Sequence, residues 1–225
     1  MLKLRAKQIL VSVKPSPLFA GMMLTAISFL IYIFQYSGSG NTYAELINSG
    51  VRDITKLSAA LVSDLMGNIG ALVLRLVFSL LNTYISFGLV CYSFRLSSGE
   101  TAVPLQEMFP PVLSFLKFFL LTIITSIVAA IGMLFFIVPG IILALCYSQA
   151  KYIMLDHPEM SVIQCMTASR KLMRGHLGEY FVLVLSFIGW NILTSISVIT
   201  GIWTYPYTGI TMALYYRAVS TEITV

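Results

Sequence analysis

Residues 112–155 constrain the fold more than any other part of the sequence. They read "VLSFLKFFLLTIITSIVAAIGMLFFIVPGIILALCYSQAKYIML", and their only charged residues are Lys117 and Lys151, one near each end. A single helix of this length would extend about 66 Å, roughly twice the 30 Å apolar core of a bilayer. Pro139 and Gly140 lie just past the middle. Since proline disrupts a helix interior and glycine permits a tight reversal, we predict a helical hairpin with its corner at Pro139–Gly140.

The rest of the chain has the same apolar character. Apolar residues make up 58% of the 225 residues and charged residues only 10%, which indicates an integral membrane protein. We predict an all-α, polytopic helical membrane protein, one transmembrane domain over residues 1–225. Its spans, about six in number, are 16–36, 65–96, the two arms within 112–155, 179–200 and 205–219. Residues 37–64 begin with the turn sequence "SGSGN" and are expected to form an external loop or surface helix.

The positive charges predict an orientation for these spans. Cytoplasmic loops of membrane proteins are enriched in Lys and Arg. With the N-terminus inside, only Arg52 and Lys56 lie outside, and Arg75 lies within the second span. We therefore expect both termini in the cytoplasm. The residues then on the cytoplasmic side are Lys3, Arg5, Lys7, Lys14, Arg95, Lys117, Lys151, Arg170, Lys171, Arg174 and Arg217.

Two segments have the pattern of amphipathic helices at the cytoplasmic face. In the connector 157–176, Ser161 and Gln164 fit a capping box and Gly175 a helix stop. One face is apolar, although Ile163 breaks the pattern, and the other carries Arg170, Lys171 and Arg174. This helix docks either on anionic lipid or a partner, or on its own bundle. The N-terminal segment 1–14 has a similar stripe of Leu2, Ala6, Ile9 and Val13.

Several blocks of sequence occur in an order that resembles a known family. They are "GLVCYSFRL", "VPGIILALCYSQAKYIMLDHPEMS", "ASRKLMRGH", "FVLVLSFIGW" and "PYTGITMALYY", within about residues 86–216. Together they resemble the bacterial integral-membrane family catalogued as domain of unknown function nine-seven-five. The resemblance implies a multi-span helical membrane protein with no assigned activity. It supplies no catalytic or ligand-binding residues.

A polar stripe on the second span is the first candidate binding site. An arginine within a membrane span is energetically costly, so Arg75 is a candidate functional residue. Asn68, Ser79 and Asn82 are further ligand-binding candidates. One interpretation is a pocket or pathway in which Arg75 attracts an anionic group. The other is structural: Arg75 reaches the outer interface and the small polar residues mediate helix packing. The stripe comprises Asp64, Asn68, Arg75, Ser79, Asn82 and Ser86.

Other candidate chemistry is weak. The polar groups of "DHPE" (156–159) match no standard metal-ligand spacing, and they more simply end a span. Cys91, Cys146 and Cys165 have no paired spacing and are expected to be apolar fillers. Gly189 is expected to allow a neighbouring helix to approach closely. We find no candidate nucleophile and therefore expect no catalytic residues. We also expect no metal and no cofactor.

These observations leave two main functional hypotheses. The first is a non-enzymatic membrane component that acts through lipid or a partner protein, with anionic lipids at the cytoplasmic face. The partner is a membrane protein or a second copy of the chain, and nucleic acid is not expected. The alternative is a small transporter or lipid-handling protein that uses the polar face of the second span.

Overall fold

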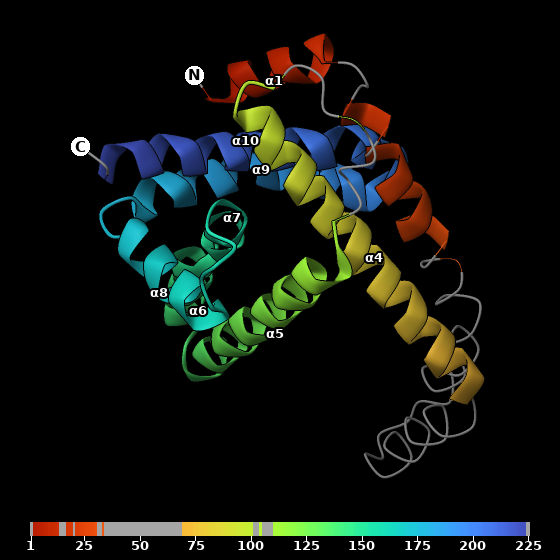
Figure 1. Cartoon of the computed structure of the whole chain (residues 1–225). Helices are drawn as coiled ribbons and strands as arrows, with labels where there is room; N and C mark the ends of the chain where they lie inside the picture. The colour runs from red at the N-terminus through yellow and green to blue at the C-terminus, as the bar shows by residue number, and fades with distance from the viewer. Residues whose placement is uncertain are drawn as a thin grey trace.

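The computed structural model describes residues 2–13, 17–19, 21–30, 33, 69–100, 104 and 110–223 (Figure 1). Over these residues the chain is helical and contains no strands. The predicted external segment 37–64 lies outside them. The labelled helices are α1 (Leu2–Ser12), α4 (Ile69–Ser97), α5 (Val112–Phe135), α6 (Ile137–Tyr147), α7 (Ala150–Asp156), α8 (Val162–Leu172), α9 (Leu177–Ile196) and α10 (Gly201–Ile223).

Four segments in the described part of the chain are long and apolar enough to cross a membrane. They correspond to the predicted second to fifth spans. The predicted first span is described only in part, as the shorter apolar helix Pro17–Leu30, and the predicted sixth span falls within α10. The four segments are Leu76–Ser97, Val112–Phe135, Ile137–Asp156 and Leu177–Ile196.

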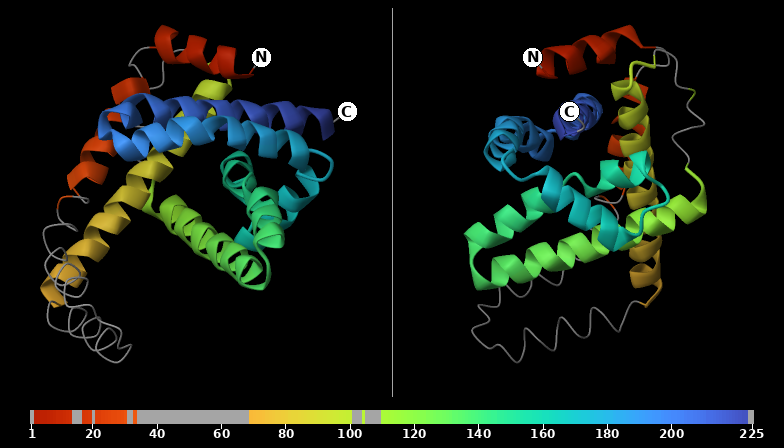
Figure 2. Two further views of the ribbon diagram at one scale, coloured as in Figure 1. Left: turned by 180° about the vertical axis from the view of Figure 1, so that it is seen from behind. Right: turned by 60° about the vertical axis from the view of Figure 1, so that its left-hand side comes forward.

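The predicted hairpin is present, but its corner lies three residues earlier than we expected. Helix α5 ends at Phe135, Phe136 has an extended backbone (φ −158°, ψ 144°), and α6 begins at Ile137. Pro139 is therefore in the first turn of α6. The backbone N–H groups of a first turn have no partner within the helix, so the missing donor of proline costs nothing there. The arms of the hairpin run side by side (Figure 2).

Gly140 lets the two arms of the hairpin approach each other. A Cβ atom at Gly140 would lie 2.6 Å from the backbone nitrogen and 2.8 Å from the Cα atom of Met133. The Cα atom of Gly140 in turn lies 3.0 Å from the position of a Cβ atom at Gly132. Two glycines that face each other thus bring the backbones of α5 and α6 into direct contact, as small residues do between membrane helices.

The inner ends of the helices meet in one buried region, which we call the hub. It contains the second half of α4, the first halves of α5 and α9, helix α7, one face of α8 and the second half of α10. Aromatic rings fill its centre: the ring centroids of Phe94 and Tyr152 lie 6.3 Å apart, and those of Tyr152 and Tyr216 lie 5.7 Å apart. The side chains of α10 from Ile210 to Tyr216 are all buried, which makes α10 the central helix.

The outer parts of the helices expose apolar side chains instead. The first half of α4, both arms of the hairpin and the second half of α9 carry exposed leucine, isoleucine and phenylalanine residues. Exposure is greatest at the hairpin tip, where Leu134 is 85% and Phe136 74% exposed. Apolar surface of this extent is typical of helices that face lipid.

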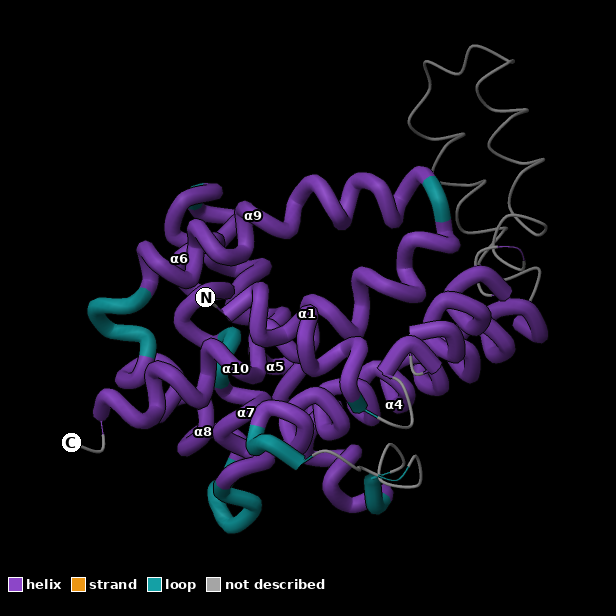
Figure 3. Tube along the Cα trace, turned by 90° about the horizontal axis from the view of Figure 1, so that it is seen from above, coloured by secondary structure: helices purple, strands orange, loops and turns teal. Residues whose placement is uncertain are grey.

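Helix α1 packs against α10, and the two helices overlap in the view from above (Figure 3). Ala6, Leu10 and Val13 are buried, whereas Leu2 and Ile9 are only partly buried. The predicted stripe is thus confirmed for Ala6 and Val13, and Leu10 replaces Ile9 at its centre. Both termini lie at the end of the molecule that also holds α8 (Figures 1 and 2).

Candidate functional site

The predicted polar stripe on the second span is only partly described. Arg75 lies in α4, but its side chain, like Asp64 and Asn68, is outside the described part of the structure. Ser79 is exposed, and Asn82 is partly buried. The hydroxyl of Ser28 donates a hydrogen bond of 3.4 Å to Oδ1 of Asn82. The structure therefore brings Asn82 against the helix that contains Ser28.

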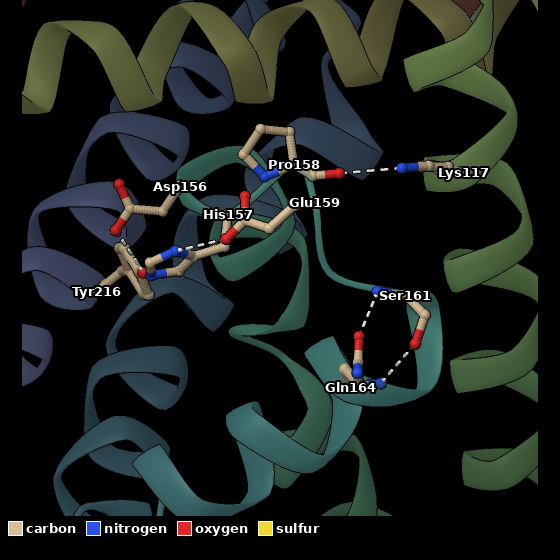
Figure 4. Close-up of polar contacts among 8 residues, drawn as sticks. All are labelled: Lys117, Asp156, His157, Pro158, Glu159, Ser161, Gln164 and Tyr216. Carbon is tan, nitrogen blue, oxygen red and sulfur yellow. Dashed lines mark hydrogen bonds and ion pairs between the residues drawn. The ribbon is translucent and has the colours of Figure 1, made fainter.

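Helix α8 has the capping and the buried face that the sequence predicted. The backbone N–H of Ser161 donates to Oε1 of Gln164 at 2.8 Å, and the backbone N–H of Gln164 donates to Oγ of Ser161 at 3.4 Å (Figure 4). Gly175 has a positive φ of 89° in the turn after the helix. The predicted break at Ile163 is also present, since this side chain is 71% exposed. The buried side chains are Cys165, Met166, Ser169, Leu172 and Met173.

Three basic residues lie on the other side of this segment: Arg170 and Lys171 are in the last turn of α8, and Arg174 is in the turn that follows it. Arg170, Lys171 and Arg174 are all exposed. None of them forms an ion pair or a side-chain hydrogen bond with another described residue. The hydroxyl of Ser169, one residue before Arg170, donates a 2.7 Å hydrogen bond to the carbonyl of Cys146 and holds α8 against α6. Helix α8 therefore combines an anchored apolar face with a cationic face that has no ion-pair partner among the described residues.

The connector between α7 and α8 is tied to two other helices (Figure 4). Tyr216 of α10 donates a 2.9 Å hydrogen bond to Oδ2 of Asp156 at the end of α7. Lys117 of α5 donates to the carbonyl of Pro158 at 2.9 Å. These contacts fix the position of the connector.

The acidic and histidine side chains of the connector form only a pair. Nδ1 of His157 lies 3.3 Å from Oε1 of Glu159. Among the residues that the structure describes, no three His, Cys, Asp or Glu side chains come together as metal ligands. Asp156 ends α7, and Ser161 caps α8, as expected for a segment that joins a span to a surface helix.

A pocket of about 340 Å³ between α5 and the α6–α7 arm is a site that the sequence analysis did not identify. Its volume lies in the range of about 300–1,000 Å³ that is usual for small-molecule sites. The facing side chains are mostly small, which is why the two arms leave space here. The lining residues are Phe118, Leu121, Thr122, Thr125, Ser126, Ala129, Ala144, Tyr147, Ser148 and Lys151.

Lys151 gives this pocket a positive charge. Its side chain is partly buried, and its Nζ atom lies 5.1 Å from the centre of the Tyr152 ring. That cation–π contact is the only interaction of its ammonium group with the described residues, because no carboxylate or hydrogen-bond acceptor pairs with it there. Lys117 differs in this respect, since its ammonium group already has the carbonyl of Pro158 as acceptor.

One sequence signal pointed toward the pocket. Thr122, Thr125, Ser126 and Ala129 recur at the spacing that places residues on one face of a helix, within an otherwise strongly apolar span. Lys151 is the only charge in the opposite arm before Asp156. The sequence does not show the register between α5 and the α6–α7 arm that places the small polar face of α5 opposite Lys151.

Comparison with known proteins adds one match. A family model described as "Protein of unknown function (DUF975)" matches residues 127–222. The match includes α6 to α8, α9 and nearly all of α10, but not α4, which the resemblance had also suggested. No curated protein and no solved structure matches the chain. The family resemblance seen in the sequence is thus confirmed for residues 127–222, the part of the chain that carries the pattern of this family of unknown function.

Proposed function

We propose that this chain is a non-enzymatic component of a bacterial cell membrane that acts through anionic lipid at the cytoplasmic face. In this proposal it has six spans, the four above together with residues 16–36 and 205–219, and both termini are cytoplasmic. Its partners are the lipid bilayer and, through the same surface, a membrane protein or a second copy of the chain.

The observation that carries the proposal is the cationic face of α8. Arg170, Lys171 and Arg174 are exposed and unpaired within the described residues, while the opposite face is buried in the hub. Basic residues near the surface of an anionic leaflet each contribute about 1 kcal/mol of attraction. A helix held in this way keeps its cations at the membrane surface without having to bind there by itself.

The distribution of charge supports the same orientation. Arg5 and Lys7 of α1, Lys117 of α5, the α8 cations and Arg217 of α10 all lie on elements that meet at the hub end. Concentration of Lys and Arg at one end of a helical membrane protein favours the cytoplasmic side for that end.

The polar face of the second span ranks lower as a functional site. The hydrogen bond between Ser28 and Asn82 favours a role in helix packing for Asn82. A transporter built around Arg75 would instead lose a bound small molecule in Arg75→Ala while the protein remained folded.

Lipid binding to the purified full-length chain tests the proposal. We expect native mass spectrometry to show more bound phosphatidylglycerol than phosphatidylcholine for the wild type. A variant with Arg170→Gln, Lys171→Gln and Arg174→Gln should lose most of this preference, whereas Arg170→Lys with Arg174→Lys should keep it. Equal binding of both lipids by the wild type, or an unchanged preference in the neutral variant, would contradict the proposal.

A further inference from the structure

The pocket between α5 and the α6–α7 arm lies within two candidate spans and contains a cation that has no counter-ion among the described residues. A charged residue inside a span is costly and normally pairs with an opposite charge, a backbone carbonyl or water. Lys151 has neither a carboxylate nor a hydrogen-bond acceptor among the described residues. An anionic ligand in the pocket would provide the missing partner.

The hydroxyl groups of the pocket are largely fixed. Thr122 donates to the carbonyl of Phe118 at 2.9 Å, Thr125 to that of Leu121 at 2.8 Å, and Ser148 to that of Leu145 at 2.7 Å. The hydrogens of these three hydroxyl groups are therefore not available to a ligand in the pocket. The donors available to an anion are then Lys151 and the hydroxyls of Ser126 and Tyr147, which make no side-chain hydrogen bond with the described residues.

The position of the pocket indicates a ligand that comes from the bilayer. Lys151 lies five residues before Asp156, the end of its candidate span, which is about 8 Å along a helix. A lysine side chain at this depth can extend its ammonium group to the lipid headgroup region. The pocket is also bounded by the apolar or small side chains of Leu121, Ala129 and Ala144, which suit an acyl chain.

We infer that this pocket binds an anionic phospholipid, with a phosphate oxygen at the ammonium group of Lys151 and an acyl chain along α5 and α6. The inference rests on the proposed function and deepens it by naming the lipid class and a site for it. This site is separate from the cationic face of α8: it holds one lipid between helices, whereas the surface of α8 interacts with many.

The test measures retention of phosphatidylglycerol by the full-length chain in native mass spectrometry during stepwise dilution into detergent. The wild type should retain one phosphatidylglycerol molecule after the others have dissociated, and phosphatidylcholine should not replace it. Lys151→Met should lower this retention at least tenfold, and Lys151→Arg should restore it. Lys117→Met is the matched control, because its ammonium group is already hydrogen-bonded to Pro158.

Two further measurements make the outcome decisive. Ala129→Leu fills the pocket without changing any charge and should also release the lipid, so the test does not depend on the folding of the Lys151 variant. Glycerol 3-phosphate added at millimolar concentration should not displace the retained lipid. Retention unchanged by Lys151→Met and Ala129→Leu, or displacement by the soluble phosphate, would overturn the inference. The neutral α8 variant should keep this one lipid, so that failure here and failure of the proposed function remain distinct.

Discussion

Single residues at the inner ends of the helices combine burial with a few fixed polar contacts. Cys165 shows the effect of burial on chemistry. Its side chain is fully buried in the face of α8 that packs on the hub. Burial raises the pKa of its thiol above the usual value, and the nearby charge of Lys117 offsets only part of this increase. Since the thiolate is the reactive form, Cys165 should be a slow nucleophile.

We therefore predict slow alkylation of Cys165 in the folded protein. In a chain with Cys91→Ser and Cys146→Ser, Cys165 should react with iodoacetamide at least tenfold more slowly at pH 7.5 than a cysteine introduced by Thr167→Cys. Thr167 is exposed on the same helix, which makes it the matched control. The rate at Cys165 should increase as the pH rises toward its elevated pKa. Equal rates at the two positions would contradict the burial of Cys165.

At the level of single elements, the hairpin depends on a glycine contact. A Cβ atom at Gly140 would meet backbone atoms of Met133, which cannot move aside as the end of a flexible side chain can. Gly189 in α9 has no atom of the described residues within 4 Å of its Cβ position, so no described helix makes the close approach that we expected there. Glycine thus occupies a crowded position at residue 140 and an open position at residue 189.

The two glycines predict opposite effects of the same substitution. Gly140→Ala should lower the free energy of unfolding by about 1–3 kcal/mol, because it forces the arms of the hairpin apart. Gly189→Ala should be neutral or stabilising by up to about 1 kcal/mol, since alanine favours a helix more than glycine does. Thermal unfolding in detergent, followed by size-exclusion chromatography, measures both. A Gly140→Ala variant as stable as the wild type would show that the arms are not in contact.

The elements that the sequence predicted well are those with local signals. Helix α8 was predictable because its cap, its stop and its 3.6-residue periodicity all lie within 15 residues. The hairpin followed from length alone, but its corner did not. Pro139 is compatible both with a break and with the first turn of a new helix, and only tertiary contacts decide between them.

The pocket at Lys151 was not predictable in the same way. Its existence depends on which residues of α5 face which residues of the α6–α7 arm, and that register is set by the contact between Gly132 and Gly140. Periodicity identifies a face of one helix but not the residue opposite it. The predicted site around Arg75 remains a hypothesis, because part of it lies outside the described residues.

At the scale of the whole molecule, the hub and the exposed apolar arms have different surroundings. The hub buries aromatic and polar side chains, and the exposed basic residues Arg170, Lys171 and Arg174 lie on or next to a helix that packs on it. The arms expose leucine, isoleucine and phenylalanine along most of their length, up to the hairpin tip at Phe136. This division has a direct consequence for topology: the tip and the hub should lie on opposite sides of the membrane.

The placement of the tip and the hub on opposite sides of the membrane can be measured by labelling single cysteines in intact cells. The background carries Cys91→Ser, Cys146→Ser and Cys165→Ser, and the test positions are Phe136→Cys at the tip and Glu159→Cys in the exposed connector. We predict that a membrane-impermeant maleimide labels Phe136→Cys in intact cells and labels Glu159→Cys only after the membrane is permeabilised. Labelling of both positions from the outside, or of Glu159→Cys alone, would contradict a hairpin that crosses the membrane from a cytoplasmic hub.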